Sequence, residues 1–198
     1  GKVWNIEKTK RWGYWPEGYY DDTVTHKRCE LKGDVEINGK VYKKYYEDGQ
    51  HVGNLREEHK RVYRYINNHD VLLYDFGMQE GDAIENYGLE YVLAHRDEFE
   101  SCGNTLHRME VVSQEHFGYD YPKSVANYWI EGIGALEGPL APFYAEMDGG
   151  TEIILVSCYI GDKCIYRKED YPDSVSGNDI WMAGSQWEVH YEDGETET

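Results

Sequence analysis

The residues that decide the fold are Val35-Glu36-Ile37-Asn38-Gly39-Lys40-Val41-Tyr42. Apolar and polar side chains alternate on both sides of the Asn-Gly pair, which is the period of a half-buried β-strand. Asn38 and Gly39 readily adopt the positive φ angles that a type I′ turn requires. This stretch therefore predicts a β-hairpin in which Asn38 and Gly39 are the two central residues of a tight turn.

A second hairpin is predicted toward the other end of the chain, in the stretch Cys158-Tyr159-Ile160-Gly161-Asp162-Lys163-Cys164. The apolar and mostly β-branched residues 153–156 lead into it, and Gly161-Asp162 supplies the turn. The two hairpins indicate an antiparallel β-protein, but neither of them indicates a chemical activity.

The cysteines leave the disulfide pattern open. A three-residue loop over 160–162 places Cys158 opposite Cys164, close enough for a bridge, whereas a two-residue turn pairs Tyr159 with Cys164 and points the two cysteines to opposite faces. A bridge between Cys29 and Cys102 is a second alternative, and free buried thiols are a third. An even number of cysteines with one close pair favours an oxidising compartment.

Short strand-like runs recur along the chain, with turn residues about every ten positions, which is typical of a sandwich or barrel built from hairpins. The predicted strands are residues 2–6, 29–31, 35–37, 40–46, 53–57, 61–66, 71–76, 89–95, 105–113 and 127–131 and the arms of the cysteine hairpin. No window combines helical periodicity with capping residues. The predicted fold class is all-β, an antiparallel meander, sandwich or barrel with few or no long helices.

A single β-domain over 1–198 is the simplest organisation, because no low-complexity linker divides the chain. It has an aromatic-rich N-terminal segment, 1–25, and an acidic C-terminal tail, 191–198. The apolar members of the predicted strands form the predicted core. These are Val41, Leu55, Val62, Leu72, Tyr74, Phe76, Val92, Val111, Trp129, Ile130, Ile133, Ile154, Val156 and Ile165.

The chain is strongly acidic, with 20 Lys and Arg against 38 Asp and Glu and a net charge of -18. Nucleic acid and anionic membrane surfaces are poor partners for it, because both carry the same sign of charge. No apolar run is long enough for a transmembrane segment, which needs about 18 residues. The acidity is typical of a soluble surface.

Four short blocks occur in order over about residues 29–166, and together they resemble a family of uncharacterised secreted or lipid-anchored β-rich proteins of gut bacteria. The blocks are Gly33-Asp34-Val35-Glu36-Ile37-Asn38-Gly39-Lys40-Val41-Tyr42-Lys43-Lys44, Leu55-Arg56-Glu57-Glu58, Leu72-Leu73-Tyr74-Asp75-Phe76 with Gly81-Asp82, and Trp129-Ile130-Glu131-Gly132-Ile133-Gly134. The resemblance implies export to the periplasm or cell surface, with room for a lipid anchor in a longer precursor. It implies no catalytic residue, since the blocks consist of turn, core and a few charged residues.

The sequence does not indicate a metal, a cofactor or a catalytic centre. The eight histidines have no zinc-ligand spacing, and the acidic stretches lack the twelve-residue calcium-loop pattern. Gly132-Ile133-Gly134 is not followed by a helical pattern, so it is not a dinucleotide-binding loop. Glu131, near Trp129, has the chemistry of a glycosidase acid, but a strand end entering a glycine turn explains it better.

The one functional signal is aromatic. It consists of Trp12, Tyr14, Trp15, Tyr19 and Tyr20 near the start of the chain. Exposed rings of this kind stack on sugars and other ligands while nearby acids and amides bind hydroxyl groups. The alternative is that the rings cover a barrel end or pack the termini together, with Trp181 and Trp187 toward the other end of the chain.

These observations favour a non-enzymatic binding or interaction module that is secreted, periplasmic or on the cell surface, with a glycan or a protein as the candidate ligand. A secreted hydrolase of carbohydrate or peptide is one alternative, and it requires convergent carboxylates in a pocket. A structural domain of an envelope assembly is the other.

Overall fold

The computed structural model of the protein describes residues 1–13, 20–86, 89–115, 123–143 and 151–172. Nearly all of these residues lie in antiparallel strands or in the turns that join them, and the one helical element among them is the short 3-10 turn Lys168–Asp170. Within the described ranges, no helix is long and apolar enough to cross a membrane. The predicted all-β antiparallel fold class is therefore confirmed.

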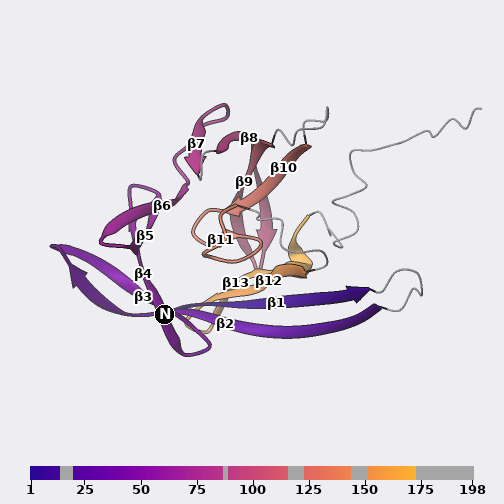
Figure 1. Ribbon diagram of the computed structural model, residues 1–198, viewed down its shortest axis with the longest axis horizontal. Coiled ribbons are helices and arrows are strands. Elements are labelled where there is room, and N and C mark those ends of the chain that lie inside the picture. The colour runs from indigo at the N-terminus through magenta and orange to yellow at the C-terminus, as the bar shows by residue number, and fades with distance from the viewer. Residues whose placement is uncertain (14–19, 87–88, 116–122, 144–150, 173–198) are drawn as a thin grey trace, which may run out of the picture.

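The larger sheet has eight strands in the order β13-β12-β1-β2-β3-β4-β5-β6, and it curls into a half-barrel. We call it the curled sheet. Its strands are β1 Lys2–Gly13, β2 Tyr20–Ile37, β3 Lys40–Glu47, β4 Gln50–Glu58, β5 Arg61–Ile66, β6 His69–Asp75, β12 Thr151–Ile160 and β13 Lys163–Arg167. Because β1 lies between β2 and β12, the first strand of the chain is paired with a strand from near the end of the described residues. Figure 1 shows β1 and β2 running side by side while β3 to β6 turn away from them.

The second sheet has five strands in the order β11-β10-β9-β8-β7. Its strands are β7 Ala83–Asn86, β8 Leu89–Ser101, β9 Asn104–Glu115, β10 Lys123–Ile130 and β11 Gly134–Ala135. The 132–139 segment, which includes β11, reaches back toward β1 and β6 of the curled sheet. This segment places one end of the second sheet over the hollow side of the curled sheet.

Both predicted hairpins form. Asn38 and Gly39 have φ angles of 52° and 74°, and their neighbours Ile37 and Lys40 are paired, so they are the two central residues of a tight turn as predicted. In the cysteine hairpin Tyr159 is paired with Cys164, which is the register of the two-residue turn. The alternation of side chains in each hairpin follows from these turns.

The bridge between Cys158 and Cys164, one of the alternatives that the sequence left open, does not form. Cys164 is bonded to Cys102, while Cys158 and Cys29 are free and buried, so the alternative bridge between Cys29 and Cys102 does not form either. The physical reason is the two-residue turn, which sends the Cys158 and Cys164 side chains to opposite faces of the hairpin. Cys102 lies in the turn between β8 and β9, where no local pattern reveals its partner.

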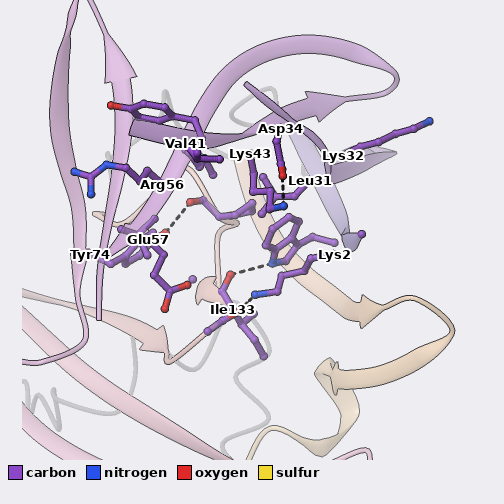
Figure 2. Close-up of a pocket in the computed structure, with 18 of the residues that line it drawn as sticks. Lys2, Leu31, Lys32, Asp34, Val41, Lys43, Arg56, Glu57, Tyr74 and Ile133 are labelled. Atoms are coloured by element: carbon purple, nitrogen blue, oxygen red, sulfur yellow. Dashed lines mark hydrogen bonds and ion pairs between the residues drawn. The ribbon is translucent and has the colours of Figure 1, made fainter. Parts of the chain in front are cut away.

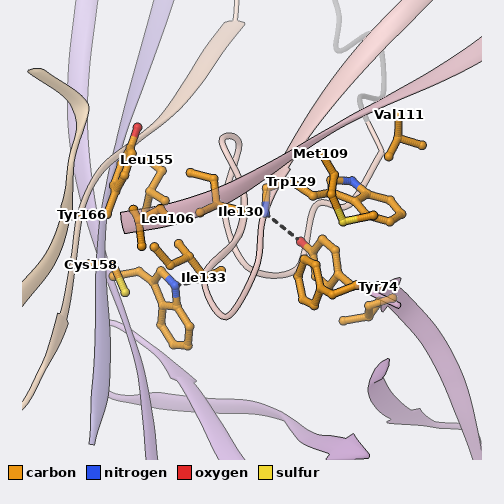
Figure 3. Close-up of a cluster of buried hydrophobic side chains, with 14 of the residues drawn as sticks. Tyr74, Leu106, Met109, Val111, Trp129, Ile130, Ile133, Leu155, Cys158 and Tyr166 are labelled. Atoms are coloured by element: carbon orange, nitrogen blue, oxygen red, sulfur yellow. Dashed lines mark hydrogen bonds between the residues drawn. The ribbon is translucent and has the colours of Figure 1, made fainter. Parts of the chain in front are cut away.

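The core lies between the two sheets and is rich in aromatic rings (Figure 3). Tyr74 stacks on Phe76 with ring centroids 5.3 Å apart, and it meets the fully buried Trp129 edge-on at 5.2 Å. Such pairs add to the stabilisation that comes from burying their large apolar area. Half of the predicted core residues are buried, namely Leu55, Tyr74, Phe76, Val111, Trp129, Ile130 and Ile133.

The other predicted core residues are only partly buried, except for Val41, whose prediction is wrong because it is 58% exposed. Register explains three of the differences. The pairing of β5 with β6 shifts between Val62 and Tyr63, and Leu73 of β6 is buried rather than Leu72. In β12 the buried residue is Leu155, which lies between the predicted Ile154 and Val156.

The two free thiols flank one tryptophan. Trp4 of β1 is paired with Cys29 on one side and with Cys158 on the other, and all three side chains are buried. Burial raises the pKa of the Cys29 thiol and raises that of Cys158 to about 12. Both thiols therefore stay protonated at neutral pH and behave as small apolar side chains.

Candidate functional site

A cavity of about 700 Å³ lies on the hollow side of the curled sheet, next to the 132–139 segment. Its walls come from β1 to β6, so the curl brings residues from six strands around one space. Figure 2 shows Val41, Lys43 and Leu31 on one side of this space and Ile133 on the other. A cavity of several hundred Å³ has the size of a typical small-molecule site.

The floor of the cavity is a continuation of the protein core. Trp4, Leu55, Tyr74, Phe76 and Ile133 line it, and each of these side chains is also a buried member of the core cluster. Apolar side chains thus extend from the centre of the molecule to an opening in its surface. A ligand that covers them gains the free energy of removing apolar surface from water.

Val41 stands at the rim of this cavity with 58% of its surface exposed. Its partner in the β2–β3 ladder is Glu36, and alternation places it on the same face of β3 as Lys43 and Tyr45. Tyr45 is covered by the core, whereas Val41 lies farther along the strand, where the cavity takes the place of packed side chains. This position explains why the alternating pattern predicts a core residue here and the structure shows an exposed one.

The 132–139 segment is fixed between β1 and the edge strand β6 of the half-barrel. Trp4 Nε1 donates to the carbonyl of Ile133 at 2.9 Å, which ties the segment to β1. On the β6 side, the Tyr74 hydroxyl lies 3.2 Å from the carbonyl oxygens of Gly138 and Pro139, and it accepts from the Ala135 N–H at 3.2 Å. One wall of the cavity is therefore held by buried hydrogen bonds, which cost free energy to break.

The mouth of the cavity carries both signs of charge. Lys43 Nζ donates to Asp34 Oδ1 at 2.5 Å, and Lys2 Nζ donates to the carbonyl of Gly132 at 2.5 Å. Glu57 also lines the cavity, and it forms no ion pair or side-chain hydrogen bond within the described part of the chain. Sequence reasoning did not single out Glu57. The available signal was its position two residues after the buried Leu55, which alternation places on the inward face of β4.

The outer face of the same strands carries a compact polar cluster of Lys40, Tyr42, Arg56 and Asp70. The Asp70 carboxylate accepts from the Tyr42 hydroxyl at 2.7 Å, from Arg56 at 2.8 Å and from Lys40 at 2.9 Å. Burial of this carboxyl opposes its ionisation, but the hydrogen bonds outweigh burial and lower the pKa of Asp70 to about 2. Figure 2 shows Arg56 pointing away from the cavity. The cluster thus joins β3, β4 and β6, and two of its members, Tyr42 and Arg56, are among the residues that line the cavity.

The aromatic residues predicted to bind a ligand cannot be compared with this cavity. Tyr14, Trp15 and Tyr19 lie outside the described residues, as do Trp181 and Trp187. Trp12 of β1 and Tyr20 of β2 lie in neighbouring rungs of one ladder, where Trp12 is paired with Asp21 and Gly13 with Tyr20. The side chains of Trp12 and Tyr20 lie outside the described part of the structure. Their role in binding therefore stays a prediction.

Glu131, considered above as a glycosidase acid, forms ion pairs with two basic side chains. Its carboxylate lies 2.8 Å from Lys60 Nζ and 3.7 Å from Arg96, so it links the β4–β5 turn to the second sheet. Within the described ranges, no three His, Cys, Asp or Glu side chains converge as metal ligands. Of the acidic side chains that line the cavity, Asp34 is paired with Lys43, and Glu57 alone remains without an ion pair in the part of the chain that the structure describes.

No protein-family model, no curated protein and no solved structure is similar to this chain. The resemblance to exported β-rich proteins of gut bacteria therefore stays a prediction.

Proposed function

We propose that this protein is a non-enzymatic binding module whose cavity on the curled sheet holds a ligand with an apolar body. The observation that carries the proposal is the continuity between core and cavity. Buried Leu55, Tyr74 and Ile133 line its floor, and Val41 stands at its rim with 58% of its surface exposed. A ligand seated there covers apolar surface that the fold leaves open to water.

Two further features support binding over hydrolysis. The wall opposite the sheet is held by hydrogen bonds from Trp4 and to and from Tyr74, so the cavity is preformed and little ordering is needed when a ligand enters. Hydrolysis of a glycoside requires two carboxylates that converge on one bond. One of the two cavity-lining carboxylates, Asp34, is instead paired with Lys43.

An exported setting is part of the proposal. The disulfide between Cys102 and Cys164 supports it, because disulfides persist in oxidising compartments and are rare in the cytosol. The excess of acidic residues supports it less directly, because it favours a soluble module that stays clear of nucleic acid.

The experiment that tests the proposal is a titration with Nile red, an uncharged dye whose fluorescence rises in apolar surroundings. We expect saturable binding to the wild-type protein and at least about a tenfold loss of affinity in Val41→Glu, since a charge at the rim must be desolvated when the dye enters. The matched control is Val24→Glu, because Val24 is 50% exposed on β2 and does not line the cavity.

Equal affinities in the two variants would contradict the proposal, and so would a wild-type protein that does not bind the dye saturably. Thermal melts of both variants are part of the experiment. Two exposed valines should each be replaced with little effect on stability, so a loss of binding in Val41→Glu alone cannot be ascribed to unfolding.

A further inference from the structure

We infer that the ligand of the cavity carries a positive charge beside its apolar body, and that Glu57 is the residue that binds this charge. The inference rests on the proposed function and adds the chemical class of the ligand, an amphipathic amine. It is drawn from how the charges at the mouth of the cavity are compensated.

Glu57 is placed to contact a ligand. It lies two residues after Leu55 on β4 and is paired with Val62 of β5, and all three residues line the cavity. Figure 2 shows its side chain extending from β4 toward the Ile133 turn, which forms the opposite wall. A ligand whose apolar part rests on Leu55 and Val62 therefore has its polar end near the Glu57 carboxylate.

The cations at the mouth are already compensated or directed elsewhere. Lys43 is paired with Asp34, and Lys2 donates to the Gly132 carbonyl and lies 5.8 Å from the centroid of the Trp4 ring. Lys32, which is exposed, extends away from the cavity in Figure 2. Among the described side chains that line the cavity, the uncompensated charge that faces the space is thus the negative charge of Glu57.

The charge of the whole protein acts in the same direction. A net charge of -18 raises the local concentration of cations and disfavours anions at every opening of the surface. An amine entering the cavity gains a charge-assisted hydrogen bond to Glu57, and Glu57 does not have to give up a cationic side chain of the protein to form it. A carboxylate of the same size meets Glu57 and the surrounding field with the unfavourable sign.

The test compares three ligands with the same alkyl chain, octylammonium, 1-octanol and octanoate, by their displacement of Nile red at low ionic strength and below their aggregation limits. We expect octylammonium to bind about fivefold more tightly than octanol and octanoate to bind more weakly than both, since a solvent-exposed carboxylate contributes only modestly. In Glu57→Gln the advantage of octylammonium over octanol should disappear, while the affinity for octanol stays the same.

The matched control is Glu85→Gln, which removes one negative charge from an exposed residue of β7 in the second sheet. It should leave the preference for octylammonium intact, because Glu85 does not line the cavity and cannot form a hydrogen bond or a close ion pair with the ammonium group. If Glu85→Gln and Glu57→Gln reduce the preference equally, the overall field decides it, and the role of Glu57 is refuted.

The outcomes separate the inference from the function on which it rests. If none of the three ligands displaces the dye from the wild-type protein, the proposed binding function fails and the inference fails with it. If octanol binds but octylammonium has no advantage, or octanoate binds most tightly, the binding function stands and the inference is overturned. If octanoate binds most tightly, the lysines at the mouth, not Glu57, select the ligand.

Discussion

Cys102, in the turn between β8 and β9, is bonded to Cys164 of β13, so one covalent link joins the second sheet to the edge of the curled sheet. Asp170 reinforces the same junction, because its Oδ2 accepts from the Ser101 hydroxyl and from the Cys102 N–H, each at 2.9 Å. The 132–139 segment that closes the cavity belongs to the second sheet. The position of that wall therefore depends in part on a junction at the far edge of the curled sheet.

The disulfide should make a large contribution to stability. It closes a loop between residues 62 positions apart, which predicts a loss of about 4 kcal/mol of unfolding free energy when Cys102 and Cys164 are both replaced by serine. Denaturant titration measures this loss. Reductant should lower the melting temperature of the wild-type protein strongly, because it breaks this bond. The control is Cys158→Ala, whose melting temperature should fall on adding reductant as much as that of the wild type. A melting temperature that no longer responds to reductant in this variant would place the bridge at Cys158 instead.

Glu137 should make the protein less stable as the pH rises toward neutrality. Its Oε2 is buried without a hydrogen-bond partner, and burial raises the pKa of its carboxyl from 4.5 to about 7. Between these two values the unfolded chain has lost this proton while the folded protein keeps it. The stabilising contribution of the protonated Glu137 is therefore fully present below about pH 4.5 and is lost as the pH rises through about 7, a change of about 3 kcal/mol.

The measurement is unfolding free energy against pH for the wild-type protein and for Glu137→Gln, which keeps the shape and cannot ionise. The variant should lack this part of the slope and should be the more stable protein at pH 7. Glu85→Gln, at an exposed position, should reproduce the wild-type curve. Parallel curves for wild type and Glu137→Gln between pH 4.5 and 7 would show that Glu137 is ionised in the folded state.

Asp70→Asn should destabilise the protein by roughly 2 kcal/mol at pH 7, because it leaves Arg56, whose side chain is only 9% exposed, without its buried counter-charge. Asp34→Asn is the matched control. It removes a carboxylate from an ion pair whose two side chains are 54% and 57% exposed, and such pairs contribute little. Equal losses in chemical denaturation would indicate that the Asp70 cluster is as well hydrated as a surface pair.

Asp70 also predicts how the wild-type protein responds to acid. Its pKa in the folded protein is about 2, below the usual 3.8, so the stabilising contribution of the carboxylate is fully present above about pH 4. It is lost as the pH falls from about 4 to about 2, because the unfolded chain takes up the proton first. Asp70→Asn should flatten the acid limb of the stability curve, whereas Asp34→Asn should leave it unchanged.

Gly134→Ala should cost more than Gly39→Ala, although both glycines have a positive φ. A Cβ at Gly39 meets nothing within 4 Å, so the cost is backbone strain of about 1 kcal/mol. A Cβ at Gly134 lies 3.0 Å from Pro139 Cα and 3.3 Å from the Tyr74 hydroxyl, which adds a steric clash and should bring the loss to about 2 kcal/mol or more. Thermal unfolding of both variants measures the difference. A smaller loss of stability for Gly134→Ala than for Gly39→Ala would mean that the 132–139 segment can shift to make room for the added methyl group.

Much of the strand pattern could be read from local sequence. The Asn38-Gly39 turn, the two-residue turn of the cysteine hairpin and most strand positions follow from alternation and from turn residues, both of which act between near neighbours. The full length of β2 and the short strand β7 were not predicted. Residues 23–28 of β2 are mostly polar and exposed, and they are in the ladder because β1 runs beside them, not because of their own pattern.

The site itself could be read only in part. Leu55, Tyr74 and Ile133 were predicted as core residues, but their role in lining a cavity depends on the curl of the sheet and on the return of the 132–139 segment. Val41 stands at an open rim and the charge of Glu57 is uncompensated because no other part of the described chain packs against the curled sheet at these two positions. Alternation decides which face of a strand a side chain occupies, but it does not decide whether that face is covered.

The sequence by itself thus determined the strands, the tight turns and the antiparallel class, because short-range sterics and period-2 burial act within a hairpin. Only the tertiary structure decided that β12 lies beside β1, that Cys102 is bonded to Cys164 and that a cavity remains inside the half-barrel. These features join residues that are 62 to more than 120 positions apart. Such pairings depend on how whole faces fit together, and no local pattern encodes that fit.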